Sequence, residues 1–181
     1  MKNNKKPVLI AVSGVKNSGK TTLIQKIIPK LKEKGLKVAT VKHDGHDFEG
    51  DVEGTDTYKH KKAGAYGTAI FSKNKFMVMK EQKDTCEEEL ISFFQEADVI
   101  LLEGFKYSDY PKIEIVRKGN SEDSVCRKET LLAVLTDTVV RNINAEDKTK
   151  ILDLNDIDKI ADLLIDYVGW CNRWGIFTKE K

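Results

Sequence analysis

Residues 7–24 of this 181-residue chain read PVLIAVSGVKNSGKTTLI. A short apolar run rich in β-branched residues leads into the pattern G-x-x-x-x-G-K-T at residues 14–21, and an amphipathic run follows. This order predicts a buried strand, a phosphate-binding loop and a helix. Gly14 and Gly19 free the backbone so that successive N–H groups turn inward toward phosphate oxygens. The stretch therefore predicts a binding site for a nucleoside triphosphate.

Individual residues of this loop have expected roles in nucleotide binding. We expect Lys20 to reach the β- and γ-phosphates and the Thr21 hydroxyl to ligate Mg²⁺. Lys16 has two interpretations, an approach to the γ-phosphate or an anionic second substrate, and plain exposure to solvent. The residues expected to hold the phosphates are Gly14, Lys16, Asn17, Ser18, Gly19, Lys20, Thr21 and Thr22.

Composition and charge narrow the class of protein. The 31 basic and 29 acidic residues leave a net charge of +2, which argues against a general nucleic-acid binder, because such proteins concentrate a basic excess on one face. Residues 1–6 are basic, but the apolar stretch after them is short and lacks a small-residue cleavage site, so we expect no signal peptide and no membrane span. Cys86, Cys126 and Cys171 form no C-x-x-C motif, which favours reduced thiols in a cytoplasm.

Alternating patterns predict one α/β domain over residues 1–181, a P-loop NTPase fold with a mostly parallel sheet covered by helices on both faces. We expect helices at about residues 19–34, 55–63, 85–95 and from 155 or 156 to about 170. We expect strands at about residues 36–41, 66–72, 76–79, 97–102, 113–116 and 131–135, the second and third forming a hairpin. In the 85–95 helix, Thr85 is the expected cap, and the expected buried side is Leu90, Ile91, Phe93 and Phe94.

Ligands of an α/β sheet bind outside the carboxyl ends of its strands, and four predicted ends carry polar residues. These ends are the loop itself and residues 42–47, 103–106 and 136–137. Glu103 ends an apolar strand in the manner of a Walker B acid, which holds Mg²⁺ or its water shell; the alternative is a surface acid. Asp98 opens the same strand, and we expect it to be only a polar strand start.

Polar residues after the second strand keep two interpretations each. Asp44 either shares the metal and positions water or has no such role. For His43, His46 and His60, contacts to substrate or phosphate are favoured over zinc, because no cysteine lies near. The lysines around His60 form either a solvated helix face or a site for an anionic ligand.

Asp137 follows a buried strand on the ligand side of the predicted sheet. A carboxylate that accepts hydrogen bonds from guanine N1–H and N2–H₂ discriminates sharply against adenine, which lacks these donors. The familiar Asn-Lys-x-Asp motif is absent, so a preference for guanine does not follow from spacing.

Five segments occur in a particular order: GVKNSGKTTL at 14–23, VKHD at 41–44, DTYKHKKAGA at 56–65, LEGFK at 102–106 and PKIEI at 111–115. Together they closely resemble the molybdopterin-guanine dinucleotide biosynthesis protein B family, MobB, over roughly residues 7–137. The five-part combination is far more specific than the phosphate loop alone.

The resemblance implies a GTP-binding protein with weak, Mg²⁺-dependent GTPase activity that acts as a homodimer. It implies assistance to the guanylyltransferase that attaches GMP to molybdopterin in molybdenum cofactor biosynthesis. Under this resemblance, residues 14–22 hold the phosphates and Glu103 lies at the Mg²⁺. His43, Asp44 and the helix around Lys59, Lys61 and Lys62 lie near the γ-phosphate or receive the anionic pterin.

The predicted reaction is phosphoryl transfer to water, with Lys20 and the loop amides stabilising the transition state. None of the chain's four arginines lies in the phosphate loop or in the other three strand ends. We therefore expect slow hydrolysis, because an arginine finger contributes about 10³ to 10⁵ in rate. Two other functions stay open: a P-loop small-molecule kinase with Asp44 or His46 as base, and a nucleotide-switched adapter or carrier in which the γ-phosphate orders residues 43–54.

Overall fold

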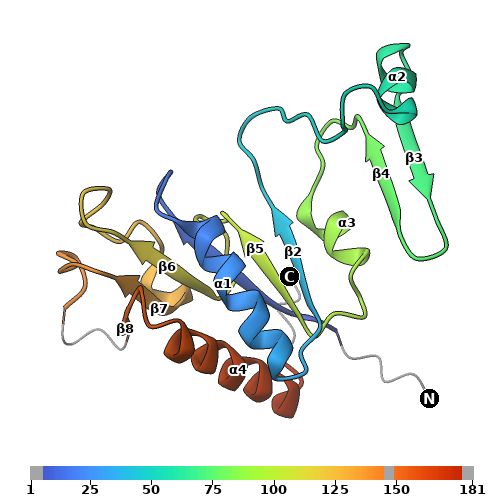
Figure 1. The fold of residues 1–181 in the computed structure, drawn as a ribbon. Coiled ribbons are helices and arrows are strands. Elements are labelled where there is room, and N and C mark those ends of the chain that lie inside the picture. The colour runs from blue at the N-terminus through green and yellow to red at the C-terminus, as the bar shows by residue number, and fades with distance from the viewer. Residues whose placement is uncertain (1–5, 145–148, 177–181) are drawn as a thin grey trace. The chain divides into compact units, whose positions relative to one another are not determined.

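A parallel sheet forms the centre of the larger part of the structure (Figure 1), a computed structural model that describes residues 6–144 and 149–176. All its neighbouring strands run parallel. The strand order is β2(Val38–Lys42), β5(Val99–Glu103), β1(Val8–Gly14), β6(Lys112–Val116), β7(Leu131–Thr136) and β8(Lys150–Asp153). β1 is buried at every residue, as expected for a central parallel strand with both faces covered. The predicted α/β fold is confirmed.

The first face of the sheet is covered by α1(Lys20–Glu33) and α4(Ile157–Trp174), which pack against each other (Figure 1). Leu23, Ile27 and Leu31 of α1 join Ile160 and Leu164 of α4 in one buried cluster with the strands. The spacing of these residues places them on one stripe of each helix. α4 extends four residues beyond the predicted end near Trp170, to Trp174. The next residue, Gly175, has the left-handed conformation that commonly ends a helix.

The second face is covered more thinly, through α3(Glu87–Ser92). The helix predicted at 85–95 is shorter, and three of its four predicted core residues are wrong. Ile91 is buried with Leu9 and Ile100, but Leu90, Phe93 and Phe94 are 36%, 56% and 38% exposed. The Thr85 hydroxyl donates to the carbonyl of Gln82 at 3.3 Å, and its predicted role as the cap of this helix stays a prediction. A helix of six residues presents few side chains to a sheet, whereas the prediction assumed three turns.

β8 was not predicted from the sequence. It has four residues, lies at the edge of the sheet, and begins and ends on the charged residues Lys150 and Asp153. A short edge strand with exposed positions lacks the continuous apolar run that marks the central strands.

Contacts divide the chain into two compact units, residues 1–43 with 88–181, and residues 44–87. The second unit contains α2(Asp56–Lys62), which contacts β3(Gly67–Phe71), and the antiparallel partner β4(Phe76–Lys80). The predicted hairpin is confirmed, as is the helix at 55–63, which Thr55 caps by accepting the N–H of Tyr58. That residues 1–181 form one domain stays a prediction.

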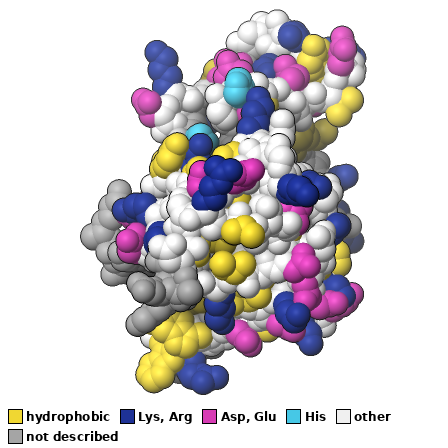
Figure 2. All heavy atoms as spheres, turned by 90° about the vertical axis from the view of Figure 1, so that its left-hand side faces the viewer, with side chains coloured by type: hydrophobic (Ala, Val, Ile, Leu, Met, Phe, Trp, Pro, Cys, Tyr) yellow, Lys and Arg dark blue, Asp and Glu magenta, His cyan; other side chains and the backbone are white. Residues whose placement is uncertain are grey.

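The surface carries charges of both signs. Figure 2 shows Lys and Arg side chains interspersed with Asp and Glu on the face that it presents. Within residues 6–144 and 149–176, no helix combines the length and the apolar character that crossing a bilayer requires. Of the three cysteines, which form no disulfide, Cys86 is exposed, whereas Cys126 and Cys171 are buried. The basic start of the chain, residues 1–5, lies outside the described residues.

Candidate functional site

The loop between β1 and α1 has the curled backbone that its sequence predicts. Gly14, Asn17 and Gly19 have positive φ angles of 140°, 62° and 97°. A Cβ atom on Gly14 would lie 2.7 Å from the carbonyl oxygen of Ile115 and 2.8 Å from Oγ of Ser18. Glycine is therefore required here both by conformation and by close approach. Ser18 itself is fully buried, and its Oγ has no hydrogen-bond partner in the described part of the chain.

Lys20 is the first residue of α1, and Gly19 is its N-cap. The Lys20 ammonium donates to the carbonyl of Val15 at 2.7 Å and to that of Gly14 at 3.3 Å, so the side chain lies along the loop. Burial lowers the pKa of Lys20, Glu103 opposes this shift, and the nearby positive charges of Lys106 and Lys42 add to it. A cluster of cations around a helix N-terminus favours binding of a polyphosphate.

Thr21 and Glu103 meet although 82 positions separate them in the chain. The Thr21 hydroxyl donates to Oε1 of Glu103 at 2.7 Å. β1 and β5 are neighbours in the sheet, with Val12 paired to Glu103, so the loop after β1 and the end of β5 lie at the same edge. A hydroxyl beside a carboxylate is the hard-oxygen donor set that Mg²⁺ prefers, and these two residues fit that ion. At the opposite end of β5, Asp98 accepts the N–H of Lys37, the structural role predicted for it.

His43 reaches this edge through its backbone. Its N–H donates to the carbonyl of Glu103 at 3.2 Å, and its ring contacts the edge of Phe105 with centroids 5.8 Å apart. This bond places His43 beside Glu103, and its contact with phosphate or substrate stays a prediction. The ring contact shows that apolar packing also orients this histidine.

The remaining residues predicted near the γ-phosphate belong to the second unit, residues 44–87. Asp44 Oδ1 accepts the N–H of His46 at 3.3 Å. Lys59 pairs with Asp56 in the same helix, and Lys61 pairs with Glu49. The ammonium of Lys62 lies over the ring of Tyr58. These local partners are compatible with a solvated helix face, and the ligand roles of the group stay predictions.

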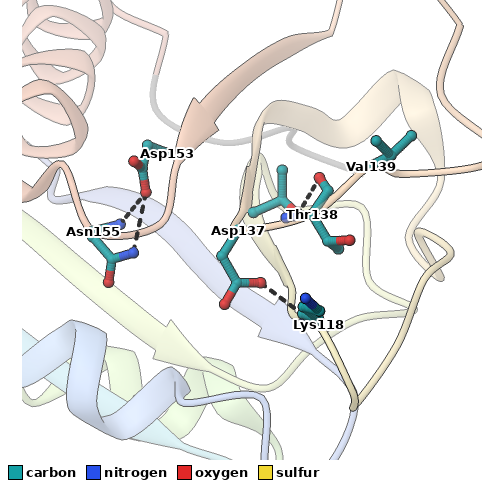
Figure 3. Close-up of a pocket in the computed structure, with 7 residues that line it drawn as sticks. Lys118, Asp137, Thr138, Val139, Asp153 and Asn155 are labelled. Atoms are coloured by element: carbon teal, nitrogen blue, oxygen red, sulfur yellow. Dashed lines mark hydrogen bonds between the residues drawn. The ribbon is translucent and has the colours of Figure 1, made fainter.

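A cavity of about 550 Å³ opens where β7 and β8 end (Figure 3). Asp137, predicted here, accepts the backbone N–H of Lys118 on Oδ1 at 2.7 Å. Asp153 accepts the backbone N–H of Asn155 at 2.8 Å. Asp153 and Asn155 were not predicted as site residues, because β8, which Asp153 ends, was not predicted. The residues that line the cavity are Lys118, Thr136, Asp137, Thr138, Val139, Asp153 and Asn155.

Arg117 is a second residue that sequence reasoning missed. It follows β6, a strand end not among the four considered, and a Cβ atom on Gly19 would lie 3.6 Å from its Nη1. An arginine therefore does lie beside the phosphate loop, and only the tertiary structure brings it there. The same rule about carboxyl ends of strands would have found it if it had been applied to residues 113–116.

β6 carries two buried charged residues that hold the neighbouring loops. Lys112 is fully buried and donates to the carbonyl of Ser108 at 2.7 Å, in the segment that follows Glu103. Glu114 accepts the N–H of Val125 at 2.7 Å and is likewise buried. Burial lowers the pKa of Lys112. The pair explains why the apolar segment at 111–115 contains two charges, since buried charges persist where backbone groups satisfy them.

Two features define the class of α/β P-loop proteins. One is a loop of this geometry after the first strand of a parallel sheet, and the other is an acid at the end of the neighbouring strand. This chain has both. The family model described as Molybdopterin guanine dinucleotide synthesis protein B, MobB, matches residues 9–137, and the chain belongs to this family. The family resemblance predicted from five short segments is confirmed.

Individual relatives agree over most of their length. The chain is 33% identical over 169 residues to the molybdopterin-guanine dinucleotide biosynthesis adapter protein of Escherichia coli (strain K12), covering 88% of this chain and 93% of the relative. It is 32% identical over 169 residues to the protein of the same description from Haemophilus influenzae, covering 92% of each chain. The crystal structure of Bacillus subtilis MobB is similar with a TM-score of 0.69 and 29% identity, covering 88% of this chain and 96% of that one.

Proposed function

We propose that this chain binds GTP with Mg²⁺, hydrolyses it slowly, and assists the guanylylation of molybdopterin in molybdenum cofactor biosynthesis. The observation that carries the nucleotide part is the 2.7 Å contact between Thr21 and Glu103. It joins the two sequence elements that hold the metal and phosphates in P-loop proteins. The names of the relatives support the assignment to this biosynthetic route.

Support for guanine comes from the cavity at the carboxyl ends of β7 and β8. Asp137 and Asp153 both lie on its wall, and carboxylate oxygens accept hydrogen bonds from N1–H and N2–H₂ of guanine. Adenine offers no such donors at these positions, so an acidic pocket penalises it. The cavity lies on the phosphate-loop side of the sheet, at the carboxyl ends of the strands, where nucleotides bind in this fold class.

The proposed hydrolysis uses groups that the structure brings together. Thr21 and Glu103 would hold Mg²⁺, which when bound neutralises charge on the β- and γ-phosphate oxygens. The Lys20 ammonium and the N–H groups of the loop bind the same oxygens. They stabilise the negative charge that passes to the β-phosphate as water bonds to the γ-phosphorus and the bridging P–O bond breaks. Asp44 is proposed to orient that water.

A homodimer is part of this proposal, and the hairpin of the second unit supports it. Phe71 and Phe76 are directly paired across the hairpin, and Val78 lies two residues further along. Residues in these positions share one face of a hairpin. They are 85%, 67% and 57% exposed, and contiguous apolar groups exposed in this way mark protein interfaces.

A cytoplasmic location is also part of the proposal. Three free thiols fit a reducing cytoplasm.

The test is calorimetric titration of the purified chain with non-hydrolysable GTP and ATP analogues in the presence of Mg²⁺. Lys20→Ala is the site variant, and Lys26→Ala, in the same helix, is the matched control. We expect guanine-selective binding that Lys20→Ala abolishes and Lys26→Ala preserves. Equal binding of both nucleotides, or of ATP alone, contradicts the guanine assignment and favours the kinase. A turnover well above about 1 s⁻¹ for the isolated chain contradicts slow hydrolysis.

A nucleotide-switched adapter is the second candidate, and the word adapter in the descriptions of the relatives favours it. Here the γ-phosphate changes the surface presented to the guanylyltransferase, and turnover only resets the switch. Affinity for the guanylyltransferase distinguishes the switched adapter from the assisting GTPase. A switch requires this affinity to differ between the GTP-analogue complex and the GDP complex, whereas an assisting GTPase requires no such difference.

A further inference from the structure

Arg117 is held in a defined place beside the phosphate loop. Its guanidinium approaches Gly19, the N-cap of α1, closely enough that a Cβ on this glycine would lie 3.6 Å from Nη1. The N-terminus of a 14-residue helix carries unpaired N–H groups and a partial positive charge. A guanidinium placed beside it adds repulsion, so its position there requires other contacts.

Those contacts come from both sides of the arginine. On the cavity side, Asp137 places Oδ2 3.8 Å from Nε of Arg117 and accepts the next N–H, of Lys118, on Oδ1. On the loop side, the Asn120 side-chain amide donates to the carbonyl of Lys16 at 3.1 Å. Asn120 and Ser121 also close a turn by donating their N–H groups to the carbonyl of Arg117. The segment is thus fixed between Asp137 and the phosphate loop.

The order of the strands shows which phosphates this arginine faces. Along the sheet, Glu103 at the end of β5 lies on one side of the phosphate loop after β1, and Arg117 at the end of β6 lies on the other. Beyond Arg117 comes the cavity at the carboxyl ends of β7 and β8. A nucleotide with its γ-phosphate at Glu103 and its base in that cavity passes its α- and β-phosphates by β6.

We infer that Arg117 binds the α- and β-phosphates of the nucleotide and that Asp137 positions it for this contact. The inference rests on the proposed nucleotide site. A guanidinium suits the task because its planar donors pair with two phosphate oxygens at once. The contact is present in both the triphosphate and the diphosphate, so it strengthens binding of both. It differs from an arginine finger at the γ-phosphoryl group, which a diphosphate lacks.

The experiment compares Arg117→Gln and Arg117→Lys with the wild type by calorimetry, using GDP, a non-hydrolysable GTP analogue and guanosine. Arg117→Gln should lose about 10- to 100-fold in affinity for both nucleotides, the usual worth of a charge-assisted contact. Guanosine affinity should stay within about threefold, and the nucleotide affinity of Arg117→Lys should lie between those of Arg117→Gln and the wild type. Arg141→Gln is the control, because Arg141 is likewise exposed and pairs with an acid, Glu122.

Each other outcome overturns the inference in its own way. Unchanged nucleotide affinity in Arg117→Gln means that the arginine does not touch the phosphates. Loss of affinity for the triphosphate alone places the arginine at the γ-phosphate. An equal loss for guanosine assigns a structural role to the pair with Asp137. Failure of the wild type itself to bind nucleotide refutes the proposed function instead.

Discussion

Replacing Gly14 by alanine should destabilise the protein far more than the same change at Gly35. At Gly14 φ is 140°, a region almost confined to glycine, and strain there costs about 1–3 kcal/mol. The new Cβ would also lie 2.7 Å from the backbone oxygen of Ile115. That oxygen belongs to the strand paired with Gly14, so relieving the contact displaces β6 and costs about 1–3 kcal/mol more.

The two terms give a loss of about 2–6 kcal/mol, against a usual total stability of about 5–15 kcal/mol. At Gly35 φ is 80°, and no atom lies within 4 Å of an added Cβ. This variant bears only the left-handed strain, about 1–2 kcal/mol. In a domain of this size, each kcal/mol lost from the free energy of unfolding lowers Tm by about 2–4 °C.

Thermal unfolding followed by circular dichroism without nucleotide measures the difference. We expect a fall in Tm of about 10 °C for Gly14→Ala and of about 3–6 °C for Gly35→Ala. Both variants lose the same glycine entropy in the unfolded chain, so that contribution cancels. Equal falls in Tm would refute the argument, because they would show that the contact with Ile115 relaxes at no cost.

Three further predictions concern the site and the buried charges. Glu103→Gln should weaken Mg²⁺-dependent nucleotide affinity about 10- to 100-fold with little change in Tm. Calorimetry measures this loss, with Asp98→Asn as the control. An equally large loss of affinity in Asp98→Asn would remove the link to the metal. Lys112→Met should lower the free energy of unfolding by about 2–4 kcal/mol in urea titrations, because it leaves half-buried carbonyls of the 105–108 segment without their donor. A neutral or stabilising effect would mean that burying the ammonium costs as much as its hydrogen bonds return. Burial raises the pKa of Cys126 to about 12, so iodoacetamide at pH 9 should label exposed Cys86 and spare Cys126. The unfolded chain loses this thiol proton near pH 8.5, before the folded chain does, so the stability that the thiol confers should fall as pH rises from about 8.5 toward 12.

Local signals in the sequence were sufficient for the elements with strong patterns. Continuous apolar runs marked the buried parallel strands, and the stripe of Leu23, Ile27 and Leu31 marked α1. Such patterns are reliable because burial on both faces, or along one stripe, leaves few polar positions. The prediction failed for β8 and for the ends of α3, where short elements have partly exposed side chains. There periodicity carries little information.

The sequence alone determined the phosphate loop, the acid at the end of β5 and the family, because each is written in contiguous residues whose chemistry is local. Only the tertiary structure decided which distant residues join them. The Thr21–Glu103 contact, the approach of Arg117 to Gly19 and the cavity beside Asp137 depend on strand order and register. Strand order results from packing of the whole sheet, in which each pairing is chosen against every alternative. No single segment of the chain encodes that choice.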